Sequence, residues 1–259
     1  MSNANKYIGI FDSGVGGLTV VKSLLRAMPN ENIIYLADNK HMPYGDKTNE
    51  EIINYVLNNV EFLSKYDLKA ILIACNTADG IASSSVKAKY DIPVYGVIEQ
   101  AAIKACAITK NNKVGVIATT ATINSNEYPK QIKNINPQIE VYTMACPFLA
   151  QLIEEGNFDI GNQKIRTILK DYLTPLINNN IDTLILGCTH YDLLSPIILD
   201  IYPNLNIVSS SKCVIDKIAK ELQLNNDPNS NKEYYVTSNA KKFEEVASMF
   251  MDNIKVKEI

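Results

Sequence analysis

The chain has 259 residues, of which 46% are hydrophobic and 20% charged, as is typical of a globular protein of one or two domains. The net charge of -3 and a pI near 5.5 give no electrostatic reason to expect binding to nucleic acid or to a membrane. No apolar run approaches the roughly 20 residues of a membrane-spanning helix, and the N-terminus lacks a signal peptide's apolar core. Five cysteines fit a reducing compartment better than a disulfide framework, so we expect a cytoplasmic protein. With only two histidines and no pair of cysteines at ligand spacing, we expect no metal.

The first part of the chain alternates between predicted strands and predicted helices. Short apolar runs bounded by turn residues predict strands at 7–11, 33–37, 70–74 and 92–97. Apolar residues at helical spacing predict helices at about 15–27, from Thr48 onward and at 76–90. Thr48 stands three residues before Glu51, which is the spacing of a capping box.

The same order of elements then repeats. Strands are predicted at 113–118, 140–144, 182–186 and 205–208, with helices from about 124, at 147–156, at 163–178 and from 191. In each half the third strand runs into a cysteine, at a similar distance from the first strand. This pattern is an internal duplication of architecture.

The tail adds a predicted helix at 211–223, a strand at 234–237 and a helix from Asn239, and we expect it to return to the first half. The alternation predicts an α/β fold of two pseudo-symmetric, doubly wound domains with mostly parallel sheets. We predict one domain from 1–97 plus 209–259, and a second from 98–208. Ligands of such sheets bind beyond the carboxyl ends of the strands, so the active site is expected in the cleft between the domains.

A glycine-rich turn, Asp-Ser-Gly-Val-Gly-Gly at 12–17, follows the first strand. Its spacing differs from the G-x-G-x-x-G fingerprint of dinucleotide-binding proteins. Two interpretations stay open: the glycines form only a tight turn, or they let N–H groups at the helix start approach an anion. Asp12 is similarly open, as a helix cap or as a functional carboxylate.

Two cysteines stand at equivalent strand-to-helix junctions. Cys75 follows the predicted strand at 70–74, Cys188 follows the one at 182–186, and each is followed within two residues by a threonine. A buried cysteine usually acts as a small hydrophobic residue. We assign that role to the other three, which are Cys106, Cys146 and Cys213. The duplicated context predicts a functional role for Cys75 and Cys188.

Paired thiols suggest acid–base chemistry. A helix N-terminus lowers the pKa of a thiol placed there, and we expect this effect at both junctions. A thiolate on one side of a ligand could remove a proton from carbon while a thiol on the other side returns one, which inverts the stereocentre. Available donors to a substrate carboxylate are Ser13, Asn76, Thr77, Thr119, Thr122 and Thr189. Asp12, Glu154 and His190 are candidates for positioning protons. His41 is expected to be solvated, and Tyr44 is either a packing ring or a functional residue.

Four motifs, in this order, resemble the aspartate/glutamate racemase family. They are Phe-Asp-Ser-Gly-Val-Gly-Gly-Leu-Thr-Val at 11–20, Pro-Tyr-Gly at 43–45, Cys-Asn-Thr-Ala at 75–78 and Leu-Gly-Cys-Thr-His-Tyr at 186–191. The resemblance runs from about Tyr7 to Phe250, nearly the whole chain. It implies a cofactor-independent isomerase that interconverts L- and D-glutamate and supplies D-glutamate for peptidoglycan.

The resemblance also implies which residues form the site. The paired catalytic thiols fall on Cys75 and Cys188, with Asp12, Glu154 and His190 assisting them. The implied substrate-contacting residues are Ser13, Pro43, Tyr44, Gly45, Asn76, Thr77, Thr119, Thr122 and Thr189. Glu155, next to Glu154, is an alternative for the assisting carboxylate. The implied partner is a small-molecule substrate, glutamate, and a homodimer is one assembly left open.

At several positions the chain departs from the residues usual in that family. Ala118 and Ala121 stand where glycines are usual, Asp79 replaces a small residue, and Gln100 and Asp192 replace prolines. The added methyl groups crowd a backbone that is expected to approach a ligand. Asp79 and Asp192 are expected to add negative charge near a site for a dicarboxylate.

Three functions agree with these observations. The first is racemisation of glutamate, the second is racemisation of aspartate or another carboxylate on the same fold, and the third is a non-catalytic paralogue that binds a dicarboxylate. A pyridoxal enzyme is a weaker option, because no lysine is placed at a strand end beside a phosphate-binding loop. We therefore expect no cofactor.

Overall fold

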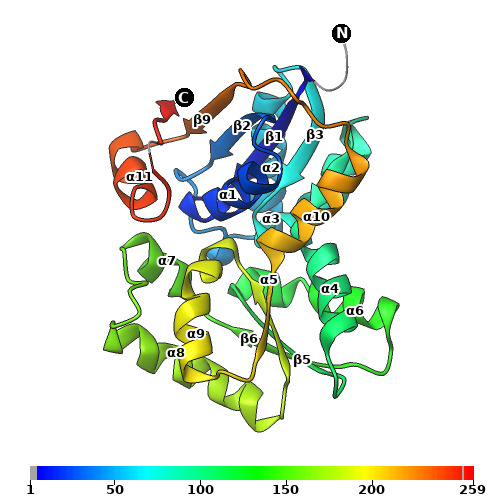
Figure 1. Cartoon of the computed structure of the whole chain (residues 1–259), viewed down its shortest axis with the longest axis vertical. Coiled ribbons are helices and arrows are strands. Elements are labelled where there is room, and N and C mark those ends of the chain that lie inside the picture. The colour runs from blue at the N-terminus through cyan, green and yellow to red at the C-terminus, as the bar shows by residue number, and fades with distance from the viewer. Residues whose placement is uncertain (1–4, 253) are drawn as a thin grey trace.

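The computed structural model describes residues 5–252 and 254–259 and contains two β-sheets (Figure 1). The first sheet has the strand order β10-β9-β2-β1-β3-β4, and the second has the order β6-β5-β7-β8. Every pairing among the described strands is parallel. The predicted α/β class with mostly parallel sheets is therefore confirmed.

The first sheet is formed by both ends of the chain. Its strands are β1 (Tyr7–Asp12), β2 (Asn32–Ala37), β3 (Leu68–Ile73), β4 (Val94–Gly96), β9 (Lys232–Val236) and β10 (Lys257–Glu258). Its helical segments are η2 (Val15–Gly17), α1 (Leu18–Ala27), η3 (Tyr44–Asp46), α2 (Asn49–Leu63), α3 (Asn76–Lys89) and α11 (Ala240–Ala247). The tail returns to this sheet as predicted, because β9 pairs with β2.

The second sheet is formed by the middle of the chain. Its strands are β5 (Lys113–Ala118), β6 (Glu140–Ala145), β7 (Thr183–Gly187) and β8 (Asn206–Ser209). Its helical segments are α5 (Thr120–Asn124), α6 (Glu127–Ile135), α7 (Leu149–Glu154), α8 (Gln163–Asn178), η4 (Thr189–Leu194) and α9 (Ser195–Ile201). The division into domains at 97/98 and 208/209 stays a prediction, with which the membership of the two sheets agrees.

Two helices connect the halves, namely α4 (Val97–Ile108) and α10 (Ser210–Glu221), and they pack against each other. The sequence predicted α10 but not α4. Helix α4 also contacts α6, β7 and β8, so it is covered on several sides and its apolar residues are not confined to one stripe. Among the described residues, no helix is both long and apolar enough to cross a membrane.

Local sequence signals explain several element boundaries. At the start of α2, the Thr48 side chain accepts the Glu51 N–H and the Glu51 carboxylate accepts the Thr48 N–H, which confirms the capping box. Helix α8 has the predicted bounds. The first helix begins as the 3₁₀ turn η2, and its α-helical part starts only at Leu18, after the glycines.

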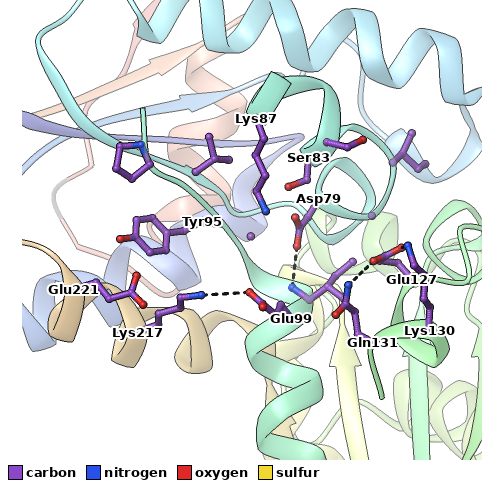
Figure 2. A pocket seen from close by; sticks show the side chains of 17 residues that line it. Asp79, Ser83, Lys87, Tyr95, Glu99, Glu127, Lys130, Gln131, Lys217 and Glu221 are labelled. Atoms are coloured by element: carbon purple, nitrogen blue, oxygen red, sulfur yellow. Dashed lines mark hydrogen bonds and ion pairs between the residues drawn. The ribbon is translucent and has the colours of Figure 1, made fainter. Parts of the chain in front are cut away.

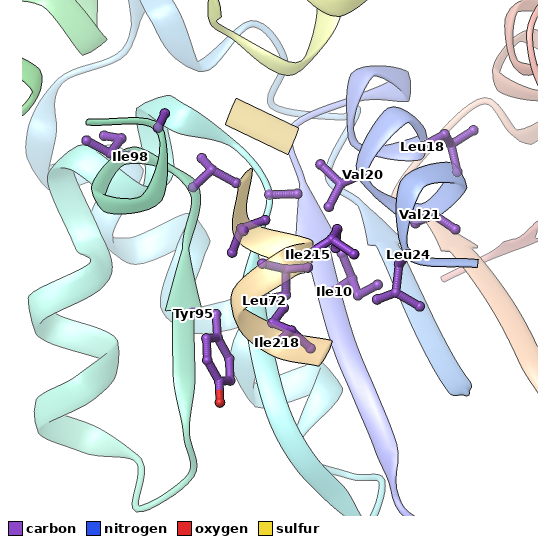
Figure 3. Close-up of a cluster of buried hydrophobic side chains, with 14 of the residues drawn as sticks. Ile10, Leu18, Val20, Val21, Leu24, Leu72, Tyr95, Ile98, Ile215 and Ile218 are labelled. Atoms are coloured by element: carbon purple, nitrogen blue, oxygen red, sulfur yellow. The ribbon is translucent and has the colours of Figure 1, made fainter. Parts of the chain in front are cut away.

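Helix α10 leaves the second sheet but packs on the first. Figure 3 shows its side chains Ile215 and Ile218 beside Ile10 of β1 and Leu72 of β3. The same apolar cluster includes Ile185 of β7. The two halves therefore share a hydrophobic core on this side, and the start of α10 is held where they meet.

Candidate active site

Cys75 and Cys188 line one cavity, although they come from different sheets. Cys75 follows β3 and is the N-cap residue of α3, and Cys188 follows β7 and precedes η4. Both are buried, with 6% and 7% of their surfaces exposed. The cavity volume of about 20 Å³ suffices for a water molecule but not for an amino acid, so a substrate needs this region to open.

Most of the predicted site residues line this cavity. The lining consists of Ser13, Met42, Pro43, Tyr44, Gly45, Cys75, Asn76, Thr77, Thr119, Ala150, Cys188, Thr189 and His190. Sequence reasoning missed Met42 and Ala150, whose apolar side chains carry no chemical signal. Asp12, Thr122 and Glu154 lie outside the lining, and each is hydrogen-bonded to a residue within it.

A histidine links Cys188 to a carboxylate. His190 Nδ1 lies 3.6 Å from Cys188 Sγ, and its Nε2 lies 2.7 Å from Glu154 Oε1. Glu155 has no part in this chain of contacts, because its carboxylate accepts the Gln151 side chain on the exposed side of α7. By geometry, Glu154 rather than Glu155 is the glutamate that pairs with the histidine beside Cys188.

His190 favours its charged form. Burial lowers the pKa of His190, but hydrogen bonds to Cys188 and Glu154 outweigh it and raise the pKa well above the usual value. The imidazolium donates from both nitrogens, one toward sulfur and one toward the carboxylate. A cation beside a sulfur stabilises a thiolate, so the Cys188 side of the cavity suits a negatively charged sulfur.

Cys75 has a different environment. Burial, followed by the negative charge of Asp12, raises the pKa of the Cys75 thiol to about 12. The expected lowering by the start of α3 is therefore wrong for the closed cavity, because desolvation outweighs the helix dipole. The thiol donates to Ser13 Oγ at 3.7 Å. The two sulfurs thus have different neighbours, because Cys188 faces the His190 ring and Cys75 faces a neutral hydroxyl.

Asp12 connects the two halves at the end of β1. Its carboxylate accepts the Gly14 N–H at 2.9 Å and the Thr189 hydroxyl at 3.1 Å. Burial raises the pKa of Asp12, while the His190 charge and these hydrogen bonds act in the opposite direction. Asp12 is therefore not a helix cap, because the helical segment begins after Gly14 without a side-chain cap; its carboxylate instead fixes the threonine that follows Cys188.

The glycine-rich turn approaches an anion, and that anion is a side chain of the protein. The Val15 N–H donates to Glu154 Oε1 at 2.9 Å. A Cβ at Gly14 would lie 2.6 Å from the same oxygen, and a Cβ at Gly16 would lie 2.5 Å from His190 Nδ1. The second interpretation of the turn is thus confirmed, since glycines let η2 pack directly on the His190–Glu154 pair.

A cluster of hydroxyl groups joins the halves at another side of the cavity. Thr77 Oγ1 lies 2.9 Å from Thr119 Oγ1 and 3.0 Å from Thr122 Oγ1, and the last two lie 2.9 Å apart. Thr77 belongs to α3, whereas Thr119 and Thr122 start α5. These three hydroxyls are donors that can turn to a ligand carboxylate if the halves separate.

Tyr44 contributes its ring to the cavity wall, while its hydroxyl is used elsewhere. The hydroxyl donates to Asp38 at 2.6 Å and accepts from Asn59 at 3.1 Å. His41, expected to be solvated, pairs with the same aspartate at 2.9 Å and stacks on the ring of Tyr55. Asp38 thus orders the loop that carries the Pro-Tyr-Gly motif.

Comparison with known proteins defines the family. Residues 8–218 match the family model described as Asp/Glu/Hydantoin racemase. The chain belongs to the Asp/Glu/Hydantoin racemase family. The match spans both sheets and includes Cys75 and Cys188.

Relatives in this racemase family resemble the chain over nearly its full length. A glutamate racemase of Sulfurihydrogenibium sp. is 40% identical over 97% of this chain and 96% of its own. The crystal structure of a glutamate racemase isoform from Bacillus anthracis matches with a TM-score of 0.94 and 37% identity, covering 99% of this chain and 98% of that one. A Francisella tularensis glutamate racemase in complex with D-glutamate matches with a TM-score of 0.90, the same identity and the same coverage. The protein is thus a racemase-family enzyme with a small-molecule substrate.

The acidic departures from the usual racemase residues lie outside the lining of the cavity. The Asp79 carboxylate accepts the Ile98 N–H at 2.9 Å, and Asp192 accepts the Ser209 hydroxyl at 2.8 Å. Neither residue lines the cavity of the two cysteines. Each carboxylate is engaged by a neighbouring helix start, so any charge that it adds near the site lies behind the cavity wall.

A larger cavity, of about 470 Å³, lies on the other part of α3 and is lined by segments of α3, β4, α4, α6 and α10 (Figure 2). Its walls carry side chains of both charges, several of them paired: Lys217 with Glu99 and Lys130 with Glu127. Asp79 reaches into the same region. Neither cysteine of the candidate active site lines this cavity.

The other three cysteines lie among apolar residues. Cys146 is buried in the core of the second half, and Cys106 and Cys213 pack against the shared core. These surroundings agree with the packing role predicted for them.

Proposed function

We propose that the protein interconverts L- and D-glutamate without a cofactor, using Cys75 and Cys188 as two acid–base groups. The observation that carries this proposal is that two thiols from different sheets line one cavity, each with different hydrogen-bond partners. Nearly full-length similarity to glutamate racemases, at about 40% identity, supports glutamate as the substrate. D-glutamate is a component of peptidoglycan, so we assign the enzyme to cell-wall synthesis. The five free cysteines support a cytoplasmic location.

The reaction needs only proton transfers at the α carbon. The thiolate of one cysteine removes the α proton, and the bonding electrons pass into the substrate carboxylate as an enediolate. The thiol of the other cysteine then delivers its proton to the opposite face of the carbon. The product is the enantiomer, one proton has been accepted and one donated, and the cysteines have exchanged protonation states.

The neighbours of each sulfur support opposite starting states. With Cys188 beside the His190 imidazolium and Cys75 bonded to Ser13 as a thiol, the resting enzyme has Cys188 as the base and Cys75 as the acid. When the roles reverse, the negative charge lies on Cys75 instead of Cys188. Asp12 and the His190–Glu154 pair are the charged groups placed to respond to this change.

Proton transfer by two groups supplies only part of the required acceleration. Each positioned acid or base contributes about 10²–10⁴-fold, or about 3–5 kcal/mol. Donors aimed at the developing enediolate contribute about 3–4 kcal/mol each when judged by their removal. Ser13, Asn76, Thr77, Thr119 and Thr189 are the polar side chains of the cavity available for this task, with Thr122 behind them.

A direct test follows the chirality of glutamate. Purified enzyme with L-glutamate and no added cofactor is expected to abolish the circular dichroism signal over time. In D₂O, either enantiomer should gain deuterium at the α carbon. Cys75→Ala and Cys188→Ala should each abolish interconversion, with Cys146→Ala as a control that leaves it intact. Full racemisation by either single active-site variant would reject the two-thiol scheme.

The same assay separates the alternative functions. Faster turnover of aspartate than of glutamate at equal concentration would assign the protein to another substrate. Calorimetric binding of glutamate without any change in optical activity would identify a non-catalytic binding protein. Both results would overturn the proposal, and the first would leave the two-thiol chemistry in place.

A further inference from the structure

Three consecutive serines at the start of α10 touch both cysteine junctions. Ser209 ends β8, Ser210 and Ser211 begin α10, and all three are at most 9% exposed. They lie where α10 crosses from the second sheet to the first (Figure 1). Nothing in the proposed proton transfers uses them, and no sequence motif pointed to them. Buried hydroxyl groups need hydrogen-bond partners, so the partners of these serines identify the residues that they position.

Ser210 holds the residue next to Cys75. Its Oγ accepts the side-chain N–H of Asn76 at 3.1 Å. The carbonyl oxygen of the same amide accepts the Tyr128 hydroxyl at 2.6 Å. Both ends of the Asn76 side chain are thereby fixed, which leaves one amide N–H uncommitted among the hydrogen bonds of the described residues. Asn76 is the first residue of α3, so Ser210 sets the helix start on which Cys75 depends.

Ser211 holds the residue next to Cys188 through one intermediary. Thr19 Oγ1 donates to Gly16 O at 2.8 Å and approaches Thr189 O at 3.3 Å. Thr19 Oγ1 is also hydrogen-bonded to Ser211 Oγ, at 3.1 Å. The chain of contacts therefore runs from Ser211 through Thr19 to Thr189.

Ser209 also contacts the junction that follows Cys188. Its hydroxyl donates to Asp192 of η4 at 2.8 Å, and its oxygen accepts the Lys212 N–H as the N-cap of α10. The three neighbouring hydroxyls thus reach α3 on the Cys75 side and η4 on the Cys188 side. A single rigid helix start sets the relative placement of both junctions.

We propose that Ser210 and Ser211 are positioning residues for racemisation, with Ser210 acting on the Cys75 step and Ser211 on the Cys188 step. This inference rests on the proposed function. Neither serine lines the cavity of the two cysteines, so neither acts on the substrate itself. Each acts through a cavity residue, Asn76 in one case and Thr189 in the other.

The test exploits the fact that each thiol removes the α proton of a different enantiomer. Enantiomers have equal free energy, so kcat/KM must fall equally in both directions for any variant, by about tenfold for the loss of one positioning hydrogen bond. The kinetic isotope effect with α-deuterated substrate need not be equal. It rises for the enantiomer whose deuteron is removed in the slowed step, and it falls for the other enantiomer.

The experiment compares Ser210→Ala with Ser211→Ala, using Ser23→Ala as the matched control. Ser23 donates to the backbone oxygen of Thr19 within α1, so the control removes a nearby hydroxyl outside the network. Cys75→Ser and Cys188→Ser establish which enantiomer each position deprotonates. We expect opposite asymmetries of the isotope effect in the two alanine variants, and the wild-type pattern in the control.

Outcomes that oppose the inference are distinct from those that oppose the proposed function. Equal changes of the isotope effect for both enantiomers, or a lowered melting temperature with wild-type kinetics, would overturn the positioning roles. Absence of α-proton exchange in the wild-type enzyme would instead reject the proposed function. If an alanine variant does not fold, Tyr128→Phe removes the other hydrogen bond of the Asn76 side chain, and Thr19→Val removes the hydroxyl between Ser211 and Thr189. The same opposite asymmetries are expected, and their absence contradicts the inference.

Discussion

The imidazole of His190 and the carboxylate of Glu154 are 2.7 Å apart and come from the two segments that follow β7 and β6. The other ring nitrogen faces Cys188, so the carboxylate of Glu154 stabilises an imidazolium that lies beside a buried sulfur. Val15 of the first half donates to the same carboxylate oxygen. The position of the His190–Glu154 pair beside Cys188 therefore depends on how closely the two halves approach.

Glu154→Gln should impair turnover in a pH-dependent way. Loss of the carboxylate lowers the raised pKa of His190, so the imidazolium is lost at a lower pH. We expect kcat to fall about ten- to a hundredfold near neutral pH and the basic limb of the pH profile to move to lower pH. The matched control is Glu155→Gln, which changes an exposed carboxylate bonded only to Gln151 among the described hydrogen bonds. An unshifted basic limb in Glu154→Gln would contradict the role of the pair.

Gly16→Ala should reduce activity more than stability. The new methyl carbon would lie 2.5 Å from His190 Nδ1 and 2.6 Å from Thr189 Oγ1, so the imidazole must move away from Cys188. A displacement of about 1 Å in a catalytic group can cost about 10²-fold in rate. The measurement pairs kcat with the melting temperature, and Gly161→Ala in an exposed loop is the control. Near-wild-type kcat in Gly16→Ala would show that the packing of η2 on His190 is dispensable.

Periodicity and turn chemistry were sufficient to predict most of the fold. Helix α8 matched its predicted range because Asn162 supplies a clear cap and the apolar stripe is regular. Helix α4 escaped prediction because neighbours cover it on several sides, so its apolar residues show no single face. The short parallel strand β10 was missed for a different reason: its exposed, charged residues resemble a loop.

The sequence was sufficient to predict which residues form the site, but not the hydrogen bonds between them. The duplicated junctions identified Cys75 and Cys188, and the structure places both in one cavity. Nothing in the sequence indicates that the Val15 N–H binds Glu154, because the two are separated by 139 positions. The environment of Cys75 was mispredicted since burial, which raises its pKa, depends on the closure of the whole cavity.

Asp79→Asn should remove a pH-dependent loss of stability. Burial raises the pKa of Asp79 from 3.8 to about 6, against the opposing effects of the Ile98 N–H, Ser83 and Lys87. The folded state thus binds this proton more tightly than the unfolded chain, so stability declines as pH rises from about 4 to about 6 and stays reduced above that. Asparagine can still accept the Ile98 N–H, which is visible in Figure 2.

We expect the Asp79→Asn variant to match the wild type near pH 4 and to exceed it above pH 6 by up to about 3 kcal/mol. Urea unfolding at a series of pH values measures this difference. Asp192, whose pKa burial also raises to about 6, titrates in both proteins and cancels from the comparison. A constant difference between the proteins at all pH values would mean that Asp79 does not titrate in this range.

Lys69→Met should destabilise the protein strongly, although Lys69 lies far from the chemistry. Lys69 in β3 and Glu31 form an ion pair of 2.5 Å, and their side chains are 2% and 0% exposed. The lysine also donates to Gln223 O, and Glu31 accepts the Asn225 N–H, so the pair fastens the segment after α10 to the first sheet. Removing one member leaves a buried charge without its partner, which costs about 3–5 kcal/mol.

Replacing both members separates the attraction within the pair from the penalty of the unpaired charge. Glu31→Leu combined with Lys69→Met should recover most of the lost unfolding free energy, because two apolar side chains need no partner. Lys6→Ala provides the surface control, since its pairing with the 60% exposed Asp67 should contribute less than about 1 kcal/mol. Urea unfolding of the wild type and these three variants gives the comparison. If the double variant is as unstable as Lys69→Met alone, then the hydrogen bonds to Gln223 and Asn225, rather than the unpaired charge, hold this segment in place.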